Sequence, residues 1–102
     1  MFHSVCKLSD LKPNEPSTFE VDDNFVLLTL IDGQVYCIDD VCTHDGATLG
    51  GGEIVGNCIE CPRHGARFDL KTGDALTMPA TEATCAHEVK IEGDNVLVQL
   101  KS

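Results

Sequence analysis

Two short motifs, each with one cysteine and one histidine, constrain the fold of this 102-residue chain more than any other feature. One residue separates Cys42 from His44, two separate Cys61 from His64, and sixteen lie between His44 and Cys61. Two ligands so close in sequence must lie on one tight loop, and two such loops can hold a metal centre between them. We therefore expect a fold that brings two thiols and two imidazoles together.

Short apolar and β-branched runs separated by turn residues make up most of the chain, and they predict strands. The expected strands are 2–6, 17–22, 25–31, 35–39, 53–55, 58–61, 66–70, 87–92 and 95–100. Asp32-Gly33-Gln34 and Gly93-Asp94 predict hairpin turns, and 71–74 predicts another turn. No window has a convincing helical period, so 9–16 is expected to be a loop with at most one helical turn.

These strands predict one all-β domain over residues 1–102, an antiparallel sandwich or barrel built from both ends of the chain. His87, Val89 and Ile91 alternate with charged residues, which predicts one buried and one wet face for that strand. The segment from about 40 to 66 is expected to be an inserted, loop-rich subdomain. Its glycines suit a backbone that bends sharply and approaches another group closely, and they are Gly46, Gly50, Gly51, Gly52 and Gly56.

The formal net charge of −10, from 17 acidic and 7 basic residues, argues against binding to nucleic acid or to an anionic membrane. It suits a partner with a basic docking patch, or it serves only solubility. The N-terminus lacks the pattern of a signal peptide, and the longest apolar run, 25–31, is too short to span a bilayer. We expect a cytoplasmic monomer. Because the cytoplasm is reducing, its six cysteines indicate metal ligation and free thiols rather than disulfides.

The stretch "CTHDGATLGGGEIVGNCIECPRHGARFD" resembles the cluster-binding region of Rieske [2Fe–2S] proteins, and most closely that of the soluble ferredoxins serving ring-hydroxylating oxygenases. The resemblance implies a Rieske-like fold and one [2Fe–2S] cluster. It implies that Cys42 and Cys61 hold one iron and that His44 and His64 hold the other. It also implies that the loop at about 77–81, with Met78-Pro79-Ala80 at its centre, covers the cluster.

The ligand types agree with this resemblance, although they leave a zinc site as an alternative. Thiolate is a soft ligand that suits an iron–sulfur core, whereas two cysteines and two histidines also suit tetrahedral zinc. Zinc fingers usually pair like residues in each half-site, and here each half-site is mixed. Cys58 and Cys61 also form a Cys-x-x-Cys pair, but on a regular strand these two residues would face opposite sides.

The remaining cysteines and histidines predict structural roles. Cys37 lies in an apolar strand and is expected to pack as a small buried hydrophobe, and the same holds for Cys6, Cys58 and Cys85. Two thiols that would form an extra disulfide between cluster loops in some Rieske proteins are missing here. We expect His3 at the surface and His87 half-buried on a strand, with neither acting as a ligand.

Three charged residues lie beside the motifs and leave two interpretations open. Arg63 and Arg67 either form salt bridges within the fold or tune the cluster and its docking face. Asp45 lies next to His44 and has the same two interpretations, with a negative charge in place of a positive one.

The resemblance implies a one-electron carrier that is not an enzyme by itself. An NAD(P)H-dependent flavoprotein reductase would load it and a terminal, ring-hydroxylating oxygenase would discharge it. Catalysis by this chain is not expected, because an oxygenase needs a second iron held by two histidines and a carboxylate. Alternatives are a small subunit of a nitrite-reductase-type complex, a ferredoxin linked to iron–sulfur assembly, and a zinc-stabilised interaction module.

The residues after the second motif predict a low reduction potential. High-potential Rieske proteins have a serine two residues after the second ligand histidine and a tyrosine two further on, whose hydroxyls hydrogen-bond to cluster sulfur. Here Ala66 and Phe68 stand at those positions, and neither can donate. We therefore expect a potential near the low end of the family, around −150 mV.

Overall fold

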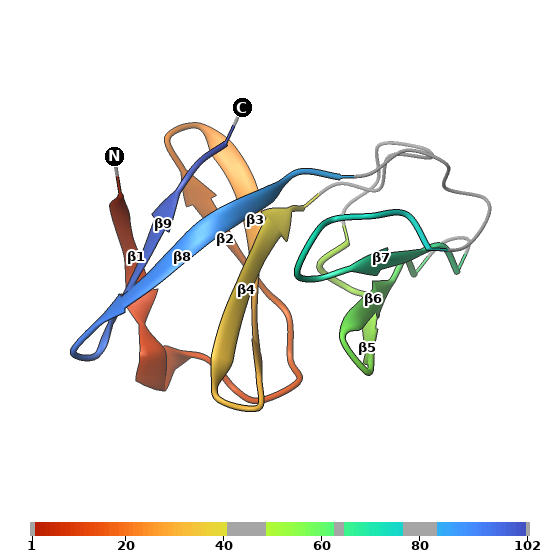
Figure 1. Cartoon of the computed structure of the whole chain (residues 1–102), viewed down its shortest axis with the longest axis horizontal. Coiled ribbons are helices and arrows are strands. Elements are labelled where there is room, and N and C mark those ends of the chain that lie inside the picture. The colour runs from red at the N-terminus through yellow and green to blue at the C-terminus, as the bar shows by residue number, and fades with distance from the viewer. Residues whose placement is uncertain (1, 41–48, 63–64, 77–83, 102) are drawn as a thin grey trace.

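The computed structural model describes residues 2–40, 49–62, 65–76 and 84–101. In these ranges nine strands form two antiparallel sheets, and there is one short 3-10 helix (Figure 1). The elements are β1 His3–Lys7, η1 Leu8–Asp10, β2 Ser17–Val21, β3 Asn24–Ile31, β4 Gln34–Asp39, β5 Glu53–Val55, β6 Cys58–Glu60, β7 Arg67–Asp69, β8 Ala86–Glu92 and β9 Asn95–Gln99. The all-β prediction is confirmed, and each expected strand is present within one or two residues of its expected bounds. Residues 9–16, expected to be a loop with at most one helical turn, overlap one 3-10 turn at Leu8–Asp10.

The larger sheet has six strands in the order β1-β9-β8-β4-β3-β2. Its first and last strands, β1 and β2, contact each other, so the sheet curls into a barrel-like shape. The β3–β4 turn is Asp32-Gly33 alone, with φ of 50° and 81°, as a two-residue hairpin turn requires. Gln34, which the sequence placed in the turn, pairs with Ile31.

The smaller sheet has three strands in the order β5-β6-β7 and lies beside the larger one (Figure 1). Each of its strands has three residues, and a bridge between Phe68 and Ala75 extends it. The chain leaves the larger sheet at the end of β4 and returns at the start of β8. These two points are joined, because the Asp39 N–H donates to the Cys85 carbonyl at 2.8 Å.

Side chains on the two faces of β3 belong to two different apolar cores. Val26 and Leu28 pack inside the larger sheet, in a core that includes Cys37, Val96 and Val98. Leu27 and Ile31 belong to a second core with Ile38 of the larger sheet and residues of the smaller sheet's region, namely Leu49, Ile59, Cys61, Ala66, Phe68 and Leu70. This explains why the run "FVLLTLI" shows no alternation: most of both faces is buried.

The burial pattern expected for β8 is wrong at one position. Val89 is half-buried, but Ile91 is 42% exposed. β8 pairs with β4 only at His87 and Ala86, so its far half extends beyond β4 with β9 as its paired neighbour. The face of β8 that carries His87, Val89 and Ile91 is therefore covered at the His87 end and open at the Ile91 end.

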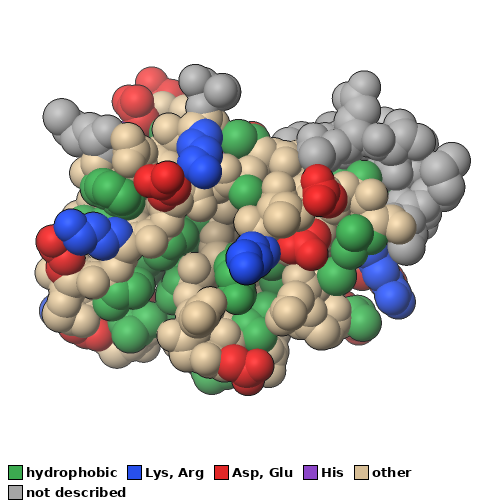
Figure 2. Space-filling view, in the orientation of Figure 1, with side chains coloured by type: hydrophobic (Ala, Val, Ile, Leu, Met, Phe, Trp, Pro, Cys, Tyr) green, Lys and Arg blue, Asp and Glu red, His purple; other side chains and the backbone are tan. Residues whose placement is uncertain are grey.

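Acidic side chains are spread over the visible surface of both parts of the molecule rather than gathered in one patch (Figure 2). None of the helical structure in the described ranges is long and apolar enough to cross a membrane.

Candidate metal centre

Cys61, the cysteine of the second cysteine–histidine motif, directly follows β6. The Cys61 N–H donates to the Ala66 carbonyl at 2.7 Å, and the Gly65 N–H donates to the Cys61 carbonyl at 3.0 Å. These bonds hold Cys61 beside Gly65 and Ala66. Cys61 is 1% exposed and has no disulfide partner. His64 and Arg63 lie outside the described residues.

Glycines leave open space beside Cys61. A depression of about 360 Å³ is lined by Gly51, Gly52, Glu53, Glu60, Cys61, Pro62 and Gly65. A Cβ on Gly52 would stand 2.1 Å from the Glu60 carbonyl oxygen and 3.1 Å from that of Leu49, so no larger residue fits there. The glycine-rich stretch thus lets two backbone segments approach each other next to a buried thiol.

The first motif, with Cys42, His44 and the neighbouring Asp45, lies outside the described residues, but the two ends of its segment are described. Asp40 precedes it and Leu49 follows it. The Leu49 N–H donates to the Asp40 carboxylate at 2.8 Å, which ties the two ends together. Met78-Pro79-Ala80 and the rest of 77–81 also lie outside the described residues.

Of the four predicted ligands, the structure therefore places only Cys61. The quartet of Cys42, His44, Cys61 and His64 stays a prediction. The described residues fit a metal centre at this place, because Cys61 is a buried thiol without a disulfide partner, beside a glycine-lined depression.

The other four cysteines in the described ranges have raised pKa values that favour the neutral thiol. Burial raises the pKa of Cys37 to about 12, with smaller contributions from Asp39 and Cys85. Burial, followed by Asp10, raises the pKa of Cys6. These two thiols pack among apolar residues in the core of the larger sheet, as predicted.

Cys58 and Cys85 behave in the same way. Burial and then Asp69 raise the pKa of Cys58, against a lowering by Arg67. Burial and then Asp39 raise the pKa of Cys85, against a lowering by Lys101. Cys58 is less buried than Cys61.

A second group of possible ligands, which the sequence did not predict, forms where β4 ends and β8 begins. Asp39, Cys85 and His87 have ligand atoms within 4.8 Å of one another. The His87 Nδ1 accepts the Lys101 N–H at 2.9 Å, so the ring proton is on Nε2, which donates to Asp39 at 2.6 Å. The Cys85 thiol donates to the Lys101 carbonyl at 3.0 Å. All three side chains already form hydrogen bonds within the fold. We therefore interpret the group as structural: it fixes the backbone of Lys101 to β8 and to the end of β4.

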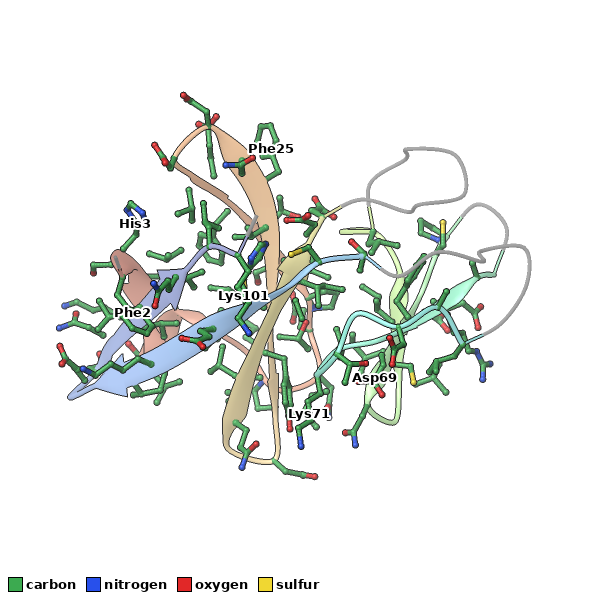
Figure 3. All side chains as sticks on the ribbon, turned by 45° about the horizontal axis from the view of Figure 1, so that its top comes forward. Phe2, His3, Phe25, Asp69, Lys71 and Lys101 are labelled. Atoms are coloured by element: carbon green, nitrogen blue, oxygen red, sulfur yellow. The ribbon has the colours of Figure 1, made fainter. Side chains whose placement is uncertain are left out.

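Three further side chains named in the sequence analysis are described by the structure: His3, His87 and Arg67. His3 lies on β1, at the opposite side of the molecule from the smaller sheet (Figure 3), and is half-buried rather than fully exposed. The His87 side chain is 3% exposed, more buried than expected. Arg67 forms an ion pair with Glu60 at 3.0 Å, between paired residues of β6 and β7, which confirms a salt bridge within the fold for this arginine.

Comparison with known proteins gives the family. The family model for the Rieske [2Fe-2S] domain matches residues 1–99. The chain belongs to the Rieske [2Fe–2S] family. The recognition from the two motifs, and the cofactor that this family implies, are thereby confirmed.

Several relatives of this Rieske chain are ferredoxins of similar length. The ferredoxin component of the naphthalene 1,2-dioxygenase system of Pseudomonas aeruginosa is 40% identical over 80 residues, 78% of this chain and 77% of the relative. The ferredoxin of carbazole 1,9a-dioxygenase from Nocardioides aromaticivorans superposes with a TM-score of 0.95 at 34% identity over 99% of both chains. A chain in the complex of reduced oxygenase and oxidized ferredoxin in carbazole 1,9a-dioxygenase has a TM-score of 0.88 at 30% identity, covering 98% of this chain and 97% of that one.

Proposed function

We propose that this Rieske protein is a one-electron carrier that accepts electrons from an NAD(P)H-dependent flavoprotein reductase and passes them to a ring-hydroxylating terminal oxygenase in the cytoplasm. The observation that carries the proposal is the buried Cys61 in its glycine-lined turn, in a chain that matches ferredoxin components over nearly its whole length. A carrier needs no substrate pocket of its own, which suits a chain of 102 residues.

We assign Cys42 and Cys61 to one iron of the cluster and His44 and His64 to the other. The cluster supplies a site that gains and loses one electron. Neutral imidazole donates less charge than thiolate, so the histidine-bound iron is the expected electron acceptor.

The chain's own residues keep this site dry and set its hydrogen bonding. Cys61, Ala66 and Phe68 are at most 1% exposed and share one apolar core. Neither the Ala66 nor the Phe68 side chain carries a hydrogen-bond donor. A hydrogen bond to a charged group contributes about 1.5–3 kcal/mol, so each missing hydroxyl lowers the potential by at most about 65–130 mV, at ~1.4 kcal/mol per 59 mV.

Reconstitution tests the carrier role. The purified protein is mixed with a flavoprotein reductase, NADH and the terminal oxygenase of a naphthalene or carbazole dioxygenase system, and product is measured with and without it. We expect product formation to require the wild-type chain and to fail with Cys61→Ser. Reduction of the protein without onward transfer to any oxygenase, together with support of nitrite reduction, would favour the nitrite-reductase alternative.

Voltammetry tests the expected potential. We expect a midpoint around −150 mV, in the low range of the family. Ala66→Ser and Phe68→Tyr should each raise it. A midpoint above about +100 mV would show that other dipoles replace the missing hydroxyls.

A further inference from the structure

Asp40 links the two parts of the molecule at the point where the first ligand motif begins. It directly follows β4 and precedes the segment 41–48, which carries Cys42 and His44, while Leu49 directly follows that segment. Asp40 is 7% exposed and Leu49 is fully buried. A buried carboxylate needs hydrogen-bond partners.

Both carboxylate oxygens of Asp40 have partners, and these come from distant parts of the chain. The Leu49 N–H donates to Oδ1 at 2.8 Å. The Thr18 hydroxyl, on β2 of the larger sheet, donates to Oδ2 at 2.9 Å. The Asp40 N–H donates to the Phe25 carbonyl at 3.1 Å, which fixes its backbone to the start of β3. The carboxylate therefore fastens the far end of the ligand segment to the larger sheet.

Gly50 lies against the Thr18–Asp40 hydrogen bond. A Cβ at position 50 would stand 2.6 Å from the Thr18 hydroxyl oxygen and 3.6 and 3.7 Å from the two Asp40 carboxylate oxygens. The absence of a side chain there lets the hydroxyl and the carboxylate meet beside the backbone that returns from the ligand segment.

We propose that Asp40 is a positioning residue for the cluster, which holds both ends of the first ligand loop at a fixed separation so that Cys42 and His44 meet Cys61 and His64. This inference rests on the proposed ligand assignment. Partners that orient metal ligands from outside the coordination sphere typically change metal affinity 10–100-fold when removed. Asp40 would act through the backbone of the loop, without contacting the cluster.

The test compares three variants of the cluster-loaded protein. Asp40→Ala removes both acceptors. Asp40→Asn can keep both hydrogen bonds, because its amide oxygen can accept from the Leu49 N–H and its amide N–H can donate to the Thr18 hydroxyl oxygen. Asp69→Ala is the matched control, because Asp69 also accepts two hydrogen bonds, from the backbone N–H groups of Lys71 and Thr72, at the end of β7 beside a turn that carries no proposed ligand (Figure 3).

The measured quantity is the rate of cluster loss to an iron chelator, followed by visible absorbance, alongside the free energy of unfolding of each variant. We expect Asp40→Ala to lose its cluster about 10-fold faster or more, with Asp40→Asn and Asp69→Ala within about threefold of wild type. Equal rates for Asp40→Ala and wild type would overturn the proposal, and so would equally fast loss in Asp69→Ala and Asp40→Ala.

If Asp40→Ala yields no cluster-loaded protein, Gly50→Ala supplies the same test more gently by pushing the Thr18 hydroxyl away from Asp40. Faster cluster loss in Gly50→Ala supports the proposal, and an unchanged rate overturns it. The carrier proposal fails separately: wild-type protein that holds its cluster but reduces no oxygenase would refute the carrier role while leaving the Asp40 result in force. Wild-type protein that holds zinc instead of iron would overturn both.

Discussion

The two sheets of the molecule differ in how their apolar side chains are covered. The larger sheet encloses a core made from its own strands, with Val26, Leu28 and Val98 among the fully buried residues. The smaller sheet has three strands of three residues each and buries its apolar side chains against the larger sheet. The core of the larger sheet therefore comes mostly from its own strands, whereas the smaller sheet depends on β3 and β4 to bury its apolar side chains.

The largest expected effect is the loss of the cluster in Cys61→Ser, and it tests this difference directly. We expect the variant to hold no iron, and the amides of β5, β6 and β7 to lose protection from hydrogen exchange while those of β3 and β8 keep theirs, because metal binding contributes to the folding of its site. Cys58→Ala should keep its colour. The ligand assignment is wrong if Cys58→Ala bleaches and Cys61→Ser does not.

Two neighbouring leucines on β3 allow a matched comparison of the two cores. Leu27 packs toward the smaller sheet and Leu28 into the larger sheet, and both are fully buried. Either change to alanine should cost about 2–5 kcal/mol of unfolding free energy. We expect only Leu27→Ala to speed cluster loss, measured with an iron chelator. Equal acceleration by Leu28→Ala would show that the two cores are not separable.

Alkaline pH should weaken the core of the larger sheet through Cys37. The folded-state pKa is raised to about 12 from an ordinary value of 9.0, so the folded thiol keeps its proton while the unfolded thiol loses it. The contribution of Cys37 is fully present below pH 9 and falls between pH 9 and 12, by up to about 1.4 kcal/mol per pH unit.

The test of this pH effect is the difference in unfolding free energy between wild type and Cys37→Ala across that range. The difference should be constant below pH 9 and shift against the wild type above it. A difference that is flat up to pH 12 would mean that the Cys37 thiol is open to solvent.

The smallest expected effect concerns Thr29, which is fully buried on β3 and lies on the same face as Leu27 and Ile31. Its hydroxyl has no hydrogen-bond partner among the described residues. Thr29→Val should leave stability unchanged or raise it by up to about 1 kcal/mol, measured by denaturant unfolding. A loss above about 1 kcal/mol would indicate that the hydroxyl is bonded within the folded protein.

Local sequence patterns predicted the strands, because each depends on residues close together in the chain. Asp32-Gly33 can adopt positive φ at both positions and so makes a two-residue turn between two apolar runs. The spacing of Cys61 and His64 predicts a ligand turn, and of this pair the structure describes Cys61, which is hydrogen-bonded to Gly65 and Ala66. The Rieske family itself was predictable, since its signature lies in two short contiguous motifs.

The same reasoning failed where distant residues decide the outcome. The exposure of Ile91 depends on how far β8 extends beyond β4. The hydrogen bond between His87 and Asp39 joins residues 48 positions apart, and that between Thr18 and Asp40 joins residues 22 apart. No periodicity or motif in the sequence reports such pairs.

The sequence by itself therefore determined the strands and the family, because backbone propensity and motif spacing are local properties. Only the tertiary structure decided that β3 serves two cores, that Cys85 and His87 hydrogen-bond to Lys101, and that Asp40 accepts hydrogen bonds from Thr18 and Leu49. The physical reason is that burial and buried hydrogen bonds are properties of packed surfaces. Which surfaces pack together is fixed only when the two sheets meet.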